Sequence, residues 1–285
     1  MAAEKRIVFH HVDKNIGEQT ILQNVSFEVQ VGEVVGIIGA NGSGKTTILR
    51  LAAGLSYPSM GDIMINGKRI QPGLVGNLPG GIGVLIESPT FLENLTGFDN
   101  LYYLSKIRNQ IDKEDIYHAL KQVGLDPNNK KKVKAYSLGM KQRLGIAQAI
   151  MERPEIILFD EPTNALDREG VSLFSSIIDE CKKRGTSFLF VSHSMEDIQN
   201  YCDRVFKIEN RTVILQENTR YYTVLLKKLE DVEKVLQIKT NARIGERLDG
   251  NPVIRIPFEA EKELHSFFDE LQMDYQLLKD KKSSW

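Results

Sequence analysis

A glycine-rich segment carries the clearest chemistry in this sequence. It runs from Gly39 to Thr47 and fits the pattern G-x-x-x-x-G-K-[ST], in which backbone N–H groups surround a polyphosphate. Glycine lets the backbone approach a phosphate closely, and a helix that begins there adds a partial positive charge. Lys45 would reach the β- and γ-phosphates, and Thr46 would hold Mg²⁺. The residues predicted to bind the nucleotide are Gly39, Asn41, Gly42, Ser43, Gly44, Lys45, Thr46 and Thr47.

Two consecutive acids follow a second apolar run. Residues 156–159 predict a buried strand, and Asp160 and Glu161 come at its carboxyl end. Ligands of open α/β sheets gather at that edge, so we expect Asp160 to hold Mg²⁺ or its water and Glu161 to deprotonate an attacking water. Paired acids at a strand end are also typical of a helix N-cap. The glycine-rich segment about 115 residues upstream favours the catalytic interpretation.

The elements around these residues predict a mostly parallel sheet. Residues 34–38 indicate a buried strand and residues 46–53 a helix, and strands at 155–159 and 187–191 flank a helix at 170–184. Upstream, alternating apolar and polar residues predict an antiparallel edge sheet. Its strands are expected within residues 6–31 and at 62–68, where the strand ends in an Asn-Gly hairpin. Another strand is expected at 82–86.

Helical periodicity replaces this pattern between residues 96 and 152 and indicates an insert, which begins with a capping box at Thr96 and Asp99. We therefore expect an ATP-binding domain over residues 1–215 and a small α+β accessory domain over 216–285. The accessory domain is expected to be ferredoxin-like, and it either caps the core or has a regulatory role. Its predicted strands are 220–225, 253–257 and 275–278, and its helices are 229–236 and 259–271.

Composition excludes several classes. The chain has 285 residues and a formal net charge of −1, so nothing global favours nucleic acid or an anionic membrane as partner. We interpret the lysines at 130–132 and 134 as a solvated loop. The two cysteines, Cys181 and Cys202, form no disulfide framework or zinc spacing, which fits a reducing cytosol. No signal peptide is recognised, and no run approaches the roughly 20 apolar residues that span a bilayer.

With these motifs in order, residues 6–215 resemble the ATP-binding subunits of ABC transporters. Residues 136–140, Tyr-Ser-Leu-Gly-Met, stand where that family carries its LSGGQ signature. The resemblance implies that Ser137 and Gly139 touch the γ-phosphate of ATP held by an opposite subunit. It further implies a P-loop NTPase core of α/β class, with the antiparallel edge sheet, the helical insert and the C-terminal α+β appendage described above.

Two further segments support the resemblance. Residues 164–167, which end in Asp167, resemble the family's D-loop, and we count Asp167 among the nucleotide-contacting residues. His193 follows a buried strand and resembles the family's switch histidine.

The sequence departs from the family pattern at three positions. Glu87 stands where a glutamine is usual, so its carboxylate would add negative charge near Mg²⁺ and either tighten metal binding or alter the placement of the water. Glu87 and its flanking residues resemble exporter ATPases for bacitracin- and lantibiotic-type peptide antibiotics. Leu138 replaces the first glycine of the signature. Ile16 stands where an aromatic residue usually stacks on adenine, so either adenine recognition is weak or Phe9, His10 or His11 supplies it.

The resemblance implies a cytoplasmic ATPase that uses ATP and Mg²⁺, with Glu161, His193 and Glu87 in catalytic roles. It would dimerise with an identical or different ATP-binding subunit and drive a separate permease from the inner face of the membrane. The expected cargo is peptide antibiotics or related amphipathic drugs, in resistance or immunity. One alternative is a non-transport ABC protein that acts on ribosomes, nucleic acid or a regulatory partner; the lack of a basic stripe argues against it. Another is an unrelated P-loop GTPase or kinase, for which an Asn-Lys-x-Asp element is missing.

Overall fold

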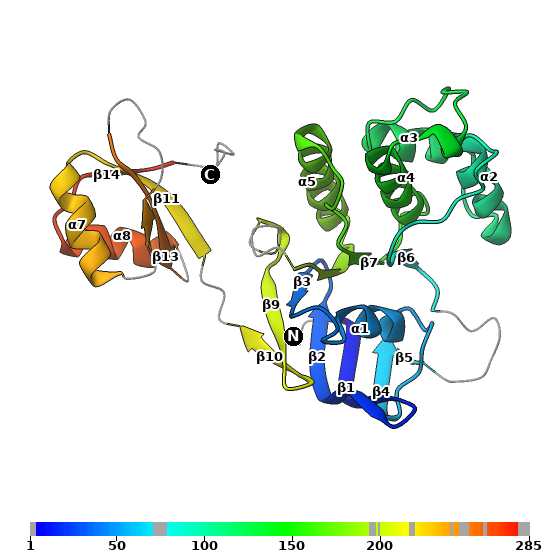
Figure 1. Cartoon of the computed structure of the whole chain (residues 1–285), viewed down its shortest axis with the longest axis horizontal. Coiled ribbons are helices and arrows are strands. Elements are labelled where there is room, and N and C mark those ends of the chain that lie inside the picture. Colours follow the sequence, from blue (N-terminus) through cyan, green and yellow to red (C-terminus); the bar gives the residue numbers. More distant parts are fainter. Residues whose placement is uncertain are drawn as a thin grey trace. The chain divides into compact units, whose positions relative to one another are not determined.

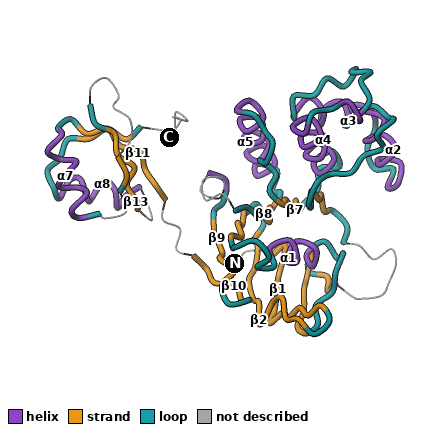
Figure 2. Tube along the Cα trace, in the orientation of Figure 1, coloured by secondary structure: helices purple, strands orange, loops and turns teal. Residues whose placement is uncertain are grey.

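The computed structural model describes residues 4–70, 79–193, 198, 200–216, 220–239, 242–244, 251–258 and 261–278. The chain forms two compact units, Met1–Gln216 and Glu217–Trp285. Figure 1 shows their helices and strands coloured by position along the sequence, and Figure 2 shows the same trace coloured by secondary structure.

A six-stranded sheet lies at the centre of the first unit. Its order is β10-β9-β3-β8-β7-β6, and β6, β7, β8, β3 and β9 pair in parallel, whereas β10 is antiparallel to β9. Every residue of β3, β7 and β8 is buried, as expected for continuous apolar runs in a parallel sheet. The prediction of a mostly parallel core is therefore confirmed. The strands are β3 (Val34–Ile38), β6 (Ile82–Leu85), β7 (Ile156–Asp160), β8 (Ser187–Val191), β9 (Arg204–Glu209) and β10 (Thr212–Gln216).

The predicted antiparallel edge sheet is also present. It has the order β2-β1-β4-β5, and Figure 1 shows the first helix, α1 (Lys45–Ala52), beside it. Apolar residues of α1, including Ile48 and Leu51, share one core with both sheets. The turn between β4 and β5 has positive φ at Asn66 and Gly67, as the Asn-Gly pair predicts. The strands are β1 (Lys5–Ile16), β2 (Gln19–Gln30), β4 (Met60–Ile65) and β5 (Lys68–Arg69).

Helices occupy the region in which the helical periodicity was found. Thr96 caps α2, because its hydroxyl accepts from the Asp99 N–H at 3.0 Å and donates to the Asp99 carboxylate at 2.7 Å. The buried Asn100 side chain bonds both the N–H and the carbonyl of Leu92, which ties the segment before the helix to α2. The elements are α2 (Gly97–Arg108), α3 (Lys113–Gln122), the 3₁₀ turn η1 (Val133–Ala135) and α4 (Leu138–Ile150), and the core helix α5 (Arg168–Lys183) follows β7.

The second unit is a small α+β fold. Its antiparallel sheet has the order β12-β13-β11-β14, which with the chain order β-α-β-β-α-β is the ferredoxin-like arrangement. Val224, Ile254, Leu264 and Phe268 are fully buried in its core. The predicted appendage is confirmed in fold class. Its elements are β11 (Arg220–Leu226), α7 (Leu229–Ile238), β12 (Arg243–Ile244), β13 (Val253–Phe258), α8 (Glu261–Glu270) and β14 (Tyr275–Leu277).

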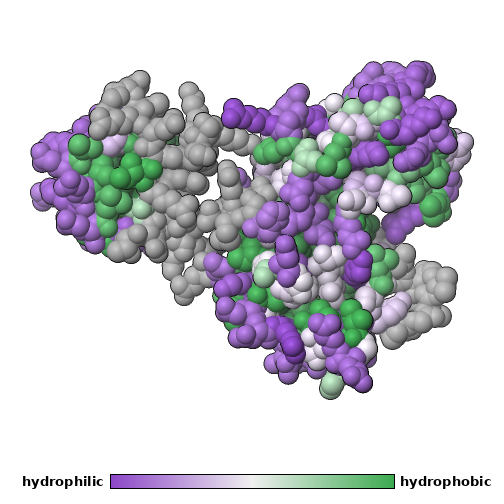
Figure 3. All heavy atoms as spheres, in the orientation of Figure 1, coloured by the Kyte–Doolittle hydropathy of each residue, from purple (hydrophilic) through white to green (hydrophobic). Residues whose placement is uncertain are grey.

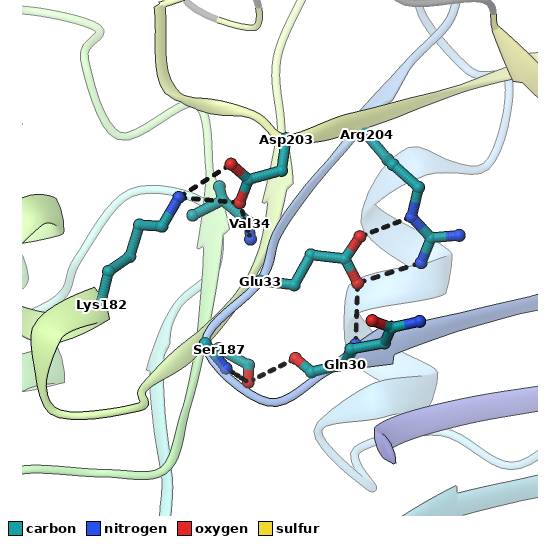
Figure 4. Close-up of polar contacts among 8 residues, drawn as sticks. Gln30, Glu33, Val34, Lys182, Ser187, Asp203 and Arg204 are labelled. Carbon is teal, nitrogen blue, oxygen red and sulfur yellow. Dashed lines mark hydrogen bonds and ion pairs between the residues drawn. The ribbon is translucent and has the colours of Figure 1, made fainter. Parts of the chain in front are cut away.

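A polar network fixes the amino-terminal edge of the parallel sheet (Figure 4). The Asp203 carboxylate accepts from the backbone N–H of Val34 at 2.9 Å and from the Lys182 ammonium at 2.8 Å. Beside it, Arg204 binds both carboxylate oxygens of Glu33, at 2.5 and 3.0 Å. These bonds join the start of β3 to β9 and α5. They therefore fix the position of the first residue of the strand that leads into the glycine-rich segment.

Replacing Asp203 with alanine should destabilise the first unit by about 1–3 kcal/mol, because the buried Val34 N–H loses its acceptor. Urea unfolding followed by circular dichroism measures the change. Glu209→Ala is the matched control, since its ion pair with Lys207 is half exposed and worth at most about 0.5 kcal/mol. Equal shifts of the two midpoints would contradict a special role for Asp203.

Candidate functional site

The glycine-rich segment forms a tight loop between β3 and α1. Gly42 and Gly44 have φ angles of 78° and 106°, a region that favours glycine. A Cβ on Gly44 would lie 2.9 Å from the Leu22 side chain, and a Cβ on Gly39 would lie 2.6 Å from the Ser43 hydroxyl. Asn41 is exposed at the tip, and Thr47 is half-buried in the first turn of α1. The loop therefore has the close backbone packing that its sequence predicted.

The inside of this loop is polar and incompletely bonded. The Lys45 ammonium is almost buried and donates to the carbonyls of Gly39 at 2.7 Å and Ala40 at 3.0 Å. The Ser43 hydroxyl is buried and has no hydrogen-bond partner among the described residues. A buried donor beside an ammonium at a helix N-terminus fits an anionic group such as a phosphate.

A single hydrogen bond joins this loop to the end of β7. The Thr46 hydroxyl donates to the Asp160 carboxylate at 2.8 Å. Burial raises the pKa of Asp160, the bond from Thr46 lowers it, and the charge of Glu161 raises it again. One hydroxyl and one carboxylate suit Mg²⁺, which binds through few protein ligands and completes its shell with phosphate oxygens and water. In the described part of the chain, no cluster of three or more acidic, histidine or cysteine side chains offers a metal site built from protein alone.

Glu161 and His193 lie in contact at the same edge. The Glu161 carboxylate accepts from the backbone N–H of His193 at 2.9 Å, from its Nδ1–H at 2.8 Å and from the Ser192 hydroxyl at 3.2 Å. Glu161 has a φ of 49°, and its own N–H bonds the carbonyl of Val191 at the end of β8. The order β3-β8-β7 thus brings the residues that follow β7 and β8 together, as the predicted sheet requires.

Glu87 also lies at this edge of the sheet. It forms an ion pair with Arg50, a residue that the sequence analysis did not single out. Its carboxylate pairs with Arg50 of α1 at 2.5 Å. Its charge is also among those that raise the pKa of Asp160, after burial and the charge of Glu161. The spacing could have revealed Arg50, since residues four apart in a helix share a face and Arg50 follows Thr46 by one turn.

The signature residues form a second group. Ser137 caps α4 through the Met140 N–H at 3.2 Å, and a Cβ on Gly139 would lie 2.7 Å from the Ala165 carbonyl. Leu138, at the position of the family's first glycine, is 68% exposed and lines the same hollow as Gly139 and Ala165. Close backbone approach is therefore present at Gly139.

Asp167 belongs to this second group. Its carboxylate caps α5 through the Gly170 N–H at 2.8 Å and accepts from Arg143 of α4 at 2.5 Å, and both bonds lower its pKa. A hollow of about 590 Å³ opens here, lined by residues that include Ser137, Gly139 and Asp167, with Asp126 and Arg143. Its lining includes no residue of the glycine-rich loop.

Of Phe9, His10 and His11, the residues considered for contact with adenine, only the two histidines are exposed. Phe9 is 2% exposed and stacks on Phe27 with ring centroids 4.6 Å apart, so its proposed role was wrong: it faces the core, as Ile7 does two residues earlier. Ile16 is 59% exposed at the end of β1. His10 and His11 are exposed on the same strand.

Comparison with known proteins identifies relatives of this chain. The family model described as ABC transporter matches residues 22–164. An uncharacterized ABC transporter ATP-binding protein of Bacillus subtilis, YybJ, is 40% identical over 211 residues, which cover 74% of this chain and 96% of YybJ. The bacitracin transport ATP-binding protein BcrA of Enterococcus faecalis is 37% identical over 204 residues, covering 71% of this chain and 66% of BcrA.

A solved structure has the same fold as the first unit. It is a dimeric ATP-binding cassette, MJ0796, in a post-hydrolysis state bound to ADP and Pi. The TM-score is 0.66 at 23% identity, and the match covers 74% of this chain and 98% of the other.

Replacing Gly139 with alanine should destabilise the first unit by about 1 kcal/mol, although alanine favours helices, because the new methyl group meets a backbone carbonyl. Leu138→Ala is the control at the neighbouring exposed position and should change stability by less than about 0.5 kcal/mol. Thermal unfolding of both variants measures the difference. A more stable Gly139→Ala variant would show that the contact with Ala165 is not tight.

Proposed function

Since the chain belongs to the ABC transporter family and is an ABC-type ATPase, we propose that two such subunits enclose ATP and Mg²⁺ and drive a separate membrane permease. The observation that carries this proposal is the Thr46–Asp160 hydrogen bond beside Lys45 and the Ser43 hydroxyl, which has no partner among the described residues. It supports the proposal because these groups suit a polyphosphate and its metal ion and lie at one edge of the sheet.

Binding of the nucleotide falls to the glycine-rich loop. The N–H groups from Gly42 to Thr47 and the Ser43 hydroxyl would donate to phosphate oxygens, and Lys45 would exchange its two carbonyl partners for them. Thr46 and Asp160 would hold the Mg²⁺ ion, which when bound neutralises charge on the phosphates. Bringing these partners in would pair the buried donors of the loop, so the loop as folded already favours binding.

Hydrolysis requires a base at the same edge, and Glu161 is that base in this proposal. Its carboxylate is held by His193 and Ser192, and these contacts fix its position next to Asp160. His193 is 60% exposed, so its imidazole stays accessible to a γ-phosphate. Glu161 would orient and deprotonate the attacking water, and His193 would orient both the phosphate and the base.

The separation of the two residue groups supports enclosure by two subunits. Ser137, Gly139 and Asp167 line a hollow of their own, which holds no residue of the loop that would bind ATP. In the proposed dimer, this hollow receives the ATP held by the opposite loop. The Ser137 hydroxyl and the N–H groups at the start of α4 would then donate to its γ-phosphate.

The contact with a permease is proposed at a groove on the helical insert. No helix within the described ranges combines the length and apolar character needed to cross a bilayer. A hollow of about 210 Å³ lies between α2, the end of α4 and the outer strand β6, lined by residues that include Leu104, Ile107 and Met151. Ile107 is 79% exposed, and Figure 3 shows apolar surface among the hydrophilic surface on the side of α2. A permease segment with apolar side chains would fill this groove.

Peptide antibiotics are the proposed cargo, and export is the proposed direction of transport. Two observations support this: Glu87 stands where glutamine is usual, and the chain is similar to BcrA, whose name assigns it to bacitracin transport. In this role the protein would lie on the inner face of the cell membrane through its permease.

Glu161→Gln should leave ATP binding intact and reduce turnover by about 10²–10⁴-fold, because the amide cannot accept the proton of the water. Lys45→Ala should instead weaken ATP binding, since the phosphates lose their buried cation. Equilibrium binding of labelled ATP and release of phosphate measure the two effects separately. Unchanged turnover in the Glu161 variant would remove it as the base, and unchanged binding in the Lys45 variant would contradict the assignment of the loop.

Ile107→Glu should reduce recovery of a polytopic membrane protein with the tagged chain from detergent-solubilised membranes of its native host, because the new charge replaces part of the apolar lining of the groove. Ile214→Glu is the matched control, as Ile214 is also exposed and apolar but lies on β10. Mass spectrometry identifies what is recovered. Recovery of soluble proteins or nucleic acid alone would contradict the transporter proposal and favour a regulatory ABC protein.

A further inference from the structure

An ion pair links the helix that follows the ATP-binding loop to the segment that leads into the helical insert. Arg50 lies on α1, and its Nη2 atom is 2.5 Å from the Glu87 Oε1 atom. Glu87 follows β6 directly. Arg50 comes one helical turn after Thr46, so both side chains lie on the face of α1 that meets Asp160.

Glu87 occupies a constrained position in this link. Its φ of 60° is uncommon for a residue with a side chain, so surrounding contacts must hold it there. The segment that it begins packs its Pro89 against α4 at Gly145 and is tied to α2 by the bonds between Leu92 and Asn100. A change in the position of the Glu87 side chain would therefore reach the helical insert through a short, bonded segment.

Arg50 also affects the balance of charge around Asp160. Asp160, Glu161 and Glu87 lie at this edge without forming one cluster, and among the described residues Lys45 and Arg50 are cations beside them. Asp160 ends β7 and Glu87 follows its parallel neighbour β6, so both lie at the same edge of the sheet. The pKa of Asp160 is raised first by burial, and the Glu87 charge adds to it. Arg50 offsets that charge and draws the Glu87 carboxylate toward α1.

We propose that Arg50 is a positioning residue for Glu87, which holds this carboxylate away from the Thr46–Asp160 pair and thereby weakens the binding of Mg²⁺ with the nucleotide. The inference rests on the proposed function, since it concerns the same ATP site. When the ion pair opens, Glu87 becomes free to approach the metal side, and the segment from residue 87 to α2 is released from α1. Arg50 thus couples occupation of the ATP site to the mobility of the segment that enters the helical insert.

The first test is a double-mutant cycle on Mg²⁺ binding. The measured quantity is the Mg²⁺ concentration that half-saturates binding of a non-hydrolysable ATP analogue. Arg50→Gln should lower that concentration about two- to fivefold, the range of a half-exposed ion pair. In the Glu87→Gln background the same change should have a clearly smaller effect, because no carboxylate is left to release. Arg50→Lys keeps the positive charge. Its half-saturating Mg²⁺ concentration should therefore differ from that of the wild type by no more than half as much as that of Arg50→Gln does.

The second test uses the nucleotide-free protein. Amide hydrogen exchange of residues 86–95 should become faster in Arg50→Gln and in Glu87→Gln, and not in Arg50→Lys, with exchange in β3 and β8 unchanged as the control for folding.

The outcomes separate this inference from the proposed function. An Arg50→Gln shift of equal size in both backgrounds, or exchange of residues 86–95 that does not respond, would overturn the inference while the ATP site stands. Failure of the wild-type chain to bind the analogue would overturn the proposed function.

Discussion

The hydrogen bond between Thr46 and Asp160 is the contact on which the site depends. It joins residues 114 positions apart, one at the start of α1 and the other at the end of β7. The sheet makes this contact possible, because β3 and β7 both pair in parallel with β8 and so end at one edge. At the opposite edge, the bonds of Asp203 and of the Glu33–Arg204 pair fix where β3 begins. The position of the glycine-rich loop is thus determined from both ends of one short strand.

The two groups of functional residues are separate on the surface and connected through the interior. The Gln142 side chain of α4 donates to the carbonyls of Glu161 at 3.3 Å and Pro162 at 2.9 Å. Arg143, the next residue, binds Asp167. The helix that presents the signature residues is therefore bonded to the segment that carries the proposed base. In the proposed dimer, where two chains complete each site, these bonds would link a displacement at one group to the other.

Much of the fold could be predicted because it depends on local patterns. The strand at 187–191 was predicted with its observed bounds, since five consecutive residues are buried in a parallel sheet. Positive φ at Asn66 and Gly67 follows from residue type alone. Contacts between distant side chains could not be predicted in the same way. The Arg50–Glu87 and Glu33–Arg204 pairs depend on which elements become neighbours. Phe9 was one of several alternatives left open for adenine, and its burial excludes it, since it alternates in step with the buried Ile7.

Sedimentation velocity of the Glu161→Gln variant tests the central claim most directly, since this variant should bind ATP and hydrolyse it only slowly. The account predicts that saturating ATP with Mg²⁺ converts it from monomer to dimer, and that removal of Mg²⁺ with a chelator reverses the change. A variant that binds ATP and remains monomeric at every protein concentration would contradict enclosure of the nucleotide between two chains.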